Sequence, residues 1–80
     1  MKINKERLAK EYSKRYEGLF NAVMFLKLPT EEIIQFPMYS PSYQICLQWA
    51  LERSNSIFSM PYAIYVDGEL RYEHDIDKLW

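Results

Sequence analysis

Apolar and polar residues alternate most regularly near the end of the chain, on both sides of Asp67-Gly68. The runs 62–66 and 69–73 are rich in residues that favour strands. Asp-Gly adopts the positive φ angles that a two-residue type I′ turn needs. Together these features predict an antiparallel β-hairpin. Such a turn would pair Val66 with Glu69 and Tyr65 with Leu70, and the pairing would continue without interruption.

The alternation gives the two faces of this hairpin different compositions. One face is apolar on both strands, which predicts that it packs on the core: Ala63, Tyr65, Leu70 and Tyr72. The other face is apolar on its first strand and charged on its second, and an apolar centre with a charged border is typical of a protein interface. The sequence therefore predicts a partner-binding surface that consists of Tyr62, Ile64, Val66, Glu69, Arg71 and Glu73.

The same apolar strip could instead be covered from within the chain. Residues 75–80 resemble a final helical turn that Asp75 would cap, and Ile76, Leu79 and Trp80 share one side of it. A two-stranded hairpin is marginally stable unless something covers it. Substituting Ile64→Asp separates the two alternatives, because an exposed strip should lose its partner while the fold stays intact.

Apolar residues recur at spacings of three and four between Leu8 and Leu26, which predicts an amphipathic helix with Asn4 as its N-cap. Pro29 ends this segment. Gly18 leaves two alternatives, a long helix that passes through it or a shorter helix followed by a buried strand at residues 19–28. We expect the long helix, because the apolar face continues in phase across Gly18.

Residues 28–42 contain three prolines and predict a connection. A third strand could form near residues 33–36, where Pro37 would restrict it to a sheet edge. Ser40-Pro41 predicts the start of a second helix, with Ser as N-cap and Pro at the first helical position. That helix is apolar except for a narrow stripe of Gln44, Gln48 and Glu52, which is typical of a central core helix.

These elements predict one α+β domain that spans residues 1–80, with two helices packed on a C-terminal antiparallel hairpin. Cys46 is the single cysteine, so an internal disulfide is excluded and a reducing compartment is indicated. The longest apolar region, residues 19–28, includes Asn21 and Lys27 and is too short and too polar to span a bilayer. The first residues also lack the apolar stretch of a signal peptide. We therefore expect a cytoplasmic protein with no membrane association.

Charge is distributed unevenly along the chain. Residues 1–27 hold seven Lys or Arg and three Glu, a net charge of +4, whereas residues 28–80 hold three basic and eight acidic residues, a net charge of −5. Arg7, Lys10 and Lys14 could contact the phosphates of a nucleic acid from one face of the first helix. Glutamates interrupt this row, so an ion-paired surface is the simpler interpretation and nucleic acid is not the expected partner.

The residue types that carry catalysis or bind metals are scarce. His74 is the single histidine, and Cys46 lies in the most apolar helix, where a thiol is usually inert. Glu31 and Glu32 are adjacent, so their side chains would not converge on one substrate. Only two glycines occur, at Gly18 and Gly68, so a glycine-rich phosphate loop is excluded. We expect no enzymatic activity, no cofactor and no metal site.

The sequence therefore predicts a small non-enzymatic protein-binding module, an adaptor or an inhibitor that occludes a partner protein. Short acidic chains without catalytic residues are also what a phage or mobile element would encode to block a host or defence protein. Two alternatives remain, a nucleic-acid-binding accessory protein and a homodimeric structural subunit formed by hairpin pairing.

Overall fold

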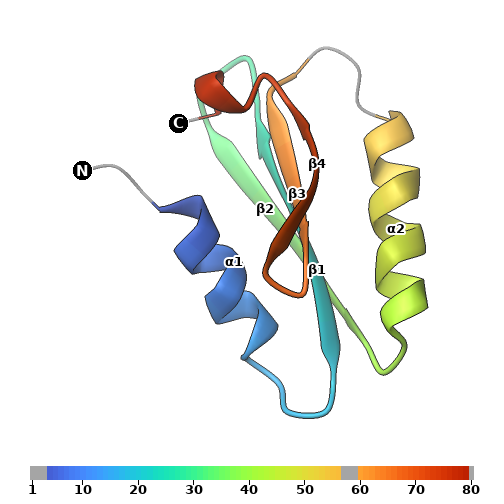
Figure 1. Cartoon of the computed structure of the whole chain (residues 1–80). Coiled ribbons are helices and arrows are strands. Elements are labelled where there is room, and N and C mark those ends of the chain that lie inside the picture. The colour runs from blue at the N-terminus through green and yellow to red at the C-terminus, as the bar shows by residue number, and fades with distance from the viewer. Residues whose placement is uncertain (1–3, 57–59, 80) are drawn as a thin grey trace.

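The computed structural model describes residues 4–56 and 60–79. Four strands form one antiparallel sheet in the order β2-β1-β3-β4. The first helix packs on one face of this sheet and the second on the other (Figure 1). The elements are α1 (Lys5–Ser13), β1 (Phe20–Lys27), β2 (Ile33–Ser40), α2 (Tyr43–Ser56), β3 (Tyr62–Val66), β4 (Glu69–His74) and the 3₁₀ turn η1 (Ile76–Lys78). The α+β class is confirmed, but the sheet is larger than the expected hairpin.

Strand β1 occupies the segment that we expected to be the second half of a long helix. The prediction was wrong, because α1 ends at Ser13 and Gly18 adopts a φ of +82° between helix and strand. Asn4 does cap α1, since its Oδ1 accepts a hydrogen bond from the backbone N–H of Arg7 at 3.1 Å. Residues 21–26 of β1 are all buried, because the strand lies inside the sheet and is covered on both faces.

Two cores result, one on each face of the sheet. The α1-side core contains Ala9, Val23, Phe25, Ala63, Tyr65 and Leu79. The α2-side core contains Ala22, Met24, Leu26, Cys46, Ala50, Tyr62, Ile64 and Val66. Both β1 and β3 supply alternate residues to both cores, so neither core could form without the shared strands.

The third strand is confirmed and extends further than expected, because β2 runs through Pro37 to Ser40. Consequently α2 starts later than predicted. Ser42, not Ser40, caps it, since the Ser42 Oγ accepts a hydrogen bond from the Ile45 N–H at 3.4 Å. The expectation of a central core helix was also wrong. Helix α2 covers a single face of the sheet and leaves Ile45 52% and Leu51 47% exposed.

The hairpin of β3 and β4 forms around Asp67-Gly68, whose φ angles are +51° and +84°. Val66 pairs with Glu69 and Tyr65 with Leu70, as predicted. The uninterrupted register beyond this point was wrong, because a β-bulge follows and Ile64 lies opposite Tyr72. The extra residue, Arg71, turns Tyr72 toward the α2-side core instead of the face that carries Tyr65.

The C-terminal turn also differs from the expectation. Asp75 precedes η1, but its side chain makes no capping hydrogen bond. Ile76 and Leu79 join the α1-side core, and Trp80 lies outside the described residues. Across the described ranges, neither helix is long and apolar enough to cross a membrane.

Candidate functional site

The apolar strip of the predicted binding surface lies inside the protein. Tyr62 is 6% exposed, and Ile64 and Val66 are fully buried, all three in the α2-side core. Helix α2 covers the strip, whereas Ile76 and Leu79 pack on the opposite face. The strip therefore offers no surface to a partner. An Ile64→Asp substitution would place a carboxylate in the core and unfold the domain instead of leaving the fold intact.

The charged part of that predicted surface remains accessible on β4. Glu69, Arg71 and Glu73 are exposed along this edge strand. The Arg71 Nη2 donates a hydrogen bond to the Tyr43 hydroxyl at 2.7 Å, and this bond raises the pKa of the arginine. Because the apolar strip that was expected to form their centre is buried, these three residues remain as charged groups along a solvated edge.

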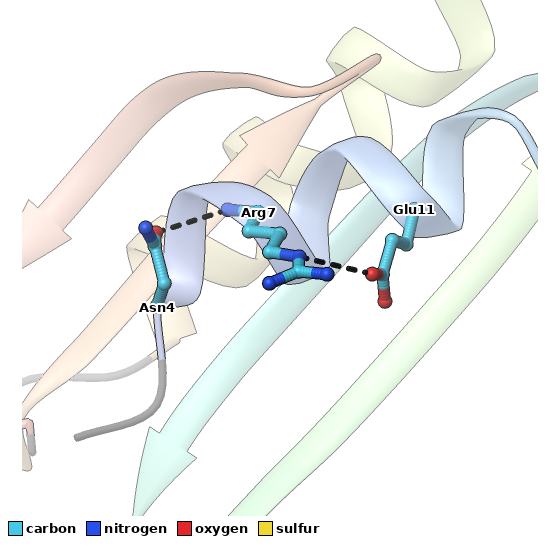
Figure 2. Close-up of polar contacts among 3 residues, drawn as sticks. All are labelled: Asn4, Arg7 and Glu11. Atoms are coloured by element: carbon cyan, nitrogen blue, oxygen red, sulfur yellow. Dashed lines mark hydrogen bonds and ion pairs between the residues drawn. The ribbon is translucent and has the colours of Figure 1, made fainter. Parts of the chain in front are cut away.

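The basic residues predicted for nucleic acid lie along the outer side of α1 and its end. Arg7 points toward Glu11, with 3.5 Å between its Nε and the Glu11 Oε1 (Figure 2). Lys10 packs beside Gly68 in the hairpin turn. The two lie so close that the Cβ of any larger residue at position 68 would be 3.3 Å from the Lys10 Cγ. Lys14 follows the last residue of α1. A shallow hollow along this helix is lined by Glu6 and Glu11 as well as these cations, which weakens any attraction for phosphate.

The structure places Cys46 in the α2-side core and His74 at the end of β4. Cys46 is fully buried, and this burial raises the pKa of its thiol, so the reactive thiolate is disfavoured. His74 stacks on the Tyr62 ring with 6.1 Å between centroids. Within the described residues, no three His, Cys, Asp or Glu side chains gather where they could hold a metal ion.

An apolar groove lies on the other side of the molecule, between α2 and edge strand β2. Its volume is about 520 Å³, and it is lined by Met24, Leu26, Gln35, Phe36, Pro37, Met38, Trp49 and Arg53. The lining is mainly apolar and aromatic, and it contains a single charged residue, Arg53. We call this feature the α2–β2 groove.

The groove exists because α2 does not reach over the whole sheet. Its two fully buried residues, Cys46 and Ala50, pack on the strands in the middle. Phe36 lies opposite Met24 in the β1–β2 ladder, so its side chain points to the same face as the α2-side core. The Phe36 side chain is nevertheless 41% exposed. A large apolar side chain therefore stands open to solvent beside the helix.

Trp49 and Arg53 form the helical wall of the groove. They are one helical turn apart, and the Arg53 guanidinium lies 5.3 Å from the centroid of the Trp49 ring. A guanidinium stacked on an aromatic ring keeps its in-plane N–H groups available for a carboxylate. The wall thus combines an apolar surface with one fixed positive charge.

The strand wall of the groove is an open sheet edge, since among residues 4–56 and 60–79 β2 pairs with β1 alone. In β1, the Lys27 N–H donates to the Pro61 carbonyl, and the Asn21 carbonyl accepts from the Asp67 N–H. The odd-numbered residues of β1 therefore direct their backbone groups toward β3. Even-numbered residues of β1 therefore bond β2. Pro37 lies opposite Val23, so its nitrogen faces away from β1 and costs the ladder nothing.

Sequence reasoning found part of this groove and missed the rest. It identified the edge strand near residues 33–36 but not the groove beside it, which Trp49 lines while packing partly buried against the α2-side core. The alternation of Ile34, Phe36 and Met38 across Pro37 was the available signal, because it marks a strand with one apolar face at a sheet edge.

No protein-family model, curated protein sequence or solved structure matches the chain significantly.

Proposed function

We propose that this protein is a non-enzymatic binding module that captures a partner protein through the α2–β2 groove, as an adaptor or as an inhibitor that occludes its partner. One observation carries the proposal. Phe36, 41% exposed, lines one groove together with Trp49 and the buried residues Met24 and Leu26. Unlike a singly exposed apolar residue, an exposed aromatic side chain that lines an apolar groove belongs to a contiguous patch, and such patches are typical of interaction sites.

The residue types in the groove support protein binding. Aromatic residues, Met and Arg are enriched at the centres of protein interfaces, and Trp and Arg recur among the residues that contribute most to affinity. Methionine side chains adapt their shape to different partners. The groove contains two methionines, Met24 and Met38, as well as both aromatic residues.

The same lining supports a binding role over a catalytic one. Among the residues that form the groove, Arg53 alone is ionisable, and a guanidinium neither gives nor takes a proton near neutral pH. A general acid, a general base or a nucleophile would have to come from elsewhere, and Cys46 is buried on the side of α2 that faces the sheet.

The test is affinity capture from a lysate of the cells that encode the protein, compared between two matched variants. Phe36→Asp places a charge in the groove, and Leu70→Asp places one on the opposite edge strand at nearly equal exposure, 41% against 42%. We expect wild type and Leu70→Asp to retain the same partner and Phe36→Asp to lose it. Mass spectrometry identifies the retained proteins, and circular dichroism verifies that both variants are folded.

Retention of the partner by Phe36→Asp, or its loss from both variants equally, would remove the α2–β2 groove as the binding surface. Trp49→Ala supplies a second check from the helical wall. It should weaken capture by at least tenfold if Trp49 contributes the roughly 2 kcal/mol typical of a central interface residue.

A further inference from the structure

We infer that the α2–β2 groove binds an extended, acidic segment of the partner, which adds to the sheet as a strand along the outer edge of β2. This inference rests on the proposed function and specifies its partner. The segment would place apolar side chains beside Phe36 and an Asp or Glu side chain at Arg53. Three features of the described residues support this mode: the open edge, the alternation of β2 and the single charge.

The open edge supplies the backbone hydrogen bonds. Because even-numbered residues of β2 face β1, Ile33 and Gln35 direct both their N–H and C=O groups outward, and Pro37 directs only its C=O. An extended peptide satisfies such groups, whereas a helix has already used its own. Pro37 also restricts the register of the added strand. Because Pro37 has no backbone N–H, it cannot donate a hydrogen bond to a carbonyl of the partner.

The alternation of β2 aligns the side chains of an added strand with the groove. Residues directly opposite each other in neighbouring strands point to the same face. A partner residue opposite Phe36 would therefore project to the α2 side, where it lies next to Phe36 and the groove. Every second partner residue would do the same, so the recognised pattern is apolar at alternate positions.

The charge of the groove selects an acidic segment. Arg53 is positive, the lining contains no carboxylate, and a guanidinium binds Asp and Glu side chains through two parallel hydrogen bonds. One cation is far fewer than the row of Lys and Arg that tracks a nucleic-acid backbone. The groove therefore fits an acidic peptide better than DNA or RNA.

The experiment is selection of a displayed library of random peptides, fused through their C-termini, on the full-length protein. Peptides that also bind the Phe36→Asp variant are removed. We expect the survivors to carry apolar residues at alternate positions and an Asp or Glu at a fixed offset from them. Fluorescence anisotropy of a labelled survivor then gives its Kd.

Two changes to this system test the mode of binding. Methylating the peptide nitrogen that faces the Gln35 carbonyl should weaken binding at least tenfold, because a strand needs that donor and side-chain docking alone does not. Arg53→Glu should weaken the acidic peptide roughly threefold to tenfold and favour a version with Lys in place of its acid. The matched control is Arg71→Glu on the opposite edge, which should leave both affinities unchanged.

Four results would overturn the inference: no selected peptide, basic consensus residues, apolar spacings of three and four that indicate a helix, or tolerance of the methylated peptide. Tight, salt-sensitive binding of single-stranded DNA that depends on Arg53 would also overturn it. Each of these results would leave the proposed function intact, since capture of a partner from lysate could still depend on Phe36. Loss of that capture would contradict both.

Discussion

Two buried side chains carry polar atoms with no hydrogen-bond partner among the described residues, the Tyr65 hydroxyl and the Asn21 Oδ1. The Asn21 Oδ1 stays unpaired, but the amide nitrogen of the same side chain donates to the Met38 carbonyl at 2.9 Å and links β1 to β2. Tyr65 has no second polar side-chain atom. Its ring packs edge-on against Phe25 with 5.7 Å between centroids, so the ring stabilises the α1-side core while the hydroxyl costs free energy.

Tyr65→Phe should therefore leave stability at neutral pH unchanged or raise it by up to about 1 kcal/mol. Burial, reinforced by Glu6 and Glu73, raises the pKa of Tyr65 from 10.0 to about 12. Between these values the unfolded chain loses the phenolic proton and the folded protein keeps it, so the free energy of unfolding falls as pH rises. Below pH 10 that contribution is fully present. The free energy of unfolding of Tyr65→Phe should therefore fall less than that of wild type between pH 10 and about 12.

Urea unfolding at neutral pH and at a pH between the two pKa values measures this difference. Tyr16→Phe is the control, because Tyr16 is 52% exposed. An equal alkaline loss in wild type and Tyr65→Phe would contradict the assignment.

At the scale of elements, the bulge in β4 determines which side chains face α2. Arg71 has no partner on β3, and the pairs before and after it are Tyr65 with Leu70 and Ile64 with Tyr72. A variant that lacks Arg71 would therefore keep every pair and lose only the bulge. We expect it to fold with a loss of about 1 kcal/mol or less, which reflects the exposed hydrogen bond to Tyr43.

Deletion of Ala63 from the facing strand is the control for this prediction. Ala63 is paired on both sides, and its removal would turn the preceding residue of β3 to the opposite face. Thermal unfolding followed by circular dichroism compares the two deletions. If deletion of Arg71 lowers thermal stability as much as deletion of Ala63, the fold requires the bulge and the prediction is wrong.

The elements also show how far the sequence could be interpreted. Asn4 and Asp67-Gly68 were predicted correctly, because a cap and a tight turn depend on a few neighbouring atoms. Strand β1 was not, because a strand covered on both faces is a continuous apolar run, and such a run satisfies helical spacing equally well. The bulge at Arg71 and the groove between α2 and β2 depend on packing between distant segments, which no local pattern encodes.

At the scale of the whole molecule, one sheet serves two cores. Alternate residues of β3 face opposite sides, with Ala63 in the α1-side core and Ile64 in the α2-side core, and β1 behaves in the same way. Damage to one core therefore loosens a strand that the other core needs. We expect the two faces to unfold together as one cooperative unit.

Mild substitutions on each side test this coupling. Ile64→Val should cost about 0.5–1.5 kcal/mol and Phe25→Leu roughly 1 kcal/mol. In a Trp80→Phe background, Trp49 fluorescence reports on α2, and far-UV circular dichroism reports on all elements. Each substitution should shift both urea midpoints equally, and a midpoint that moves for one probe alone would refute the coupling.

Pro37 has a further consequence for how copies of this protein meet. A sheet with two open edges can grow without limit if β2 of one copy joins β4 of the next, because such head-to-tail contacts never close. Here one edge lacks an outward N–H at Pro37, and the other is bent by the bulge at Arg71. Neither edge offers an unbroken ladder, which disfavours the growth of a fibre, while the short stretch before Pro37 leaves room for the single strand that we propose.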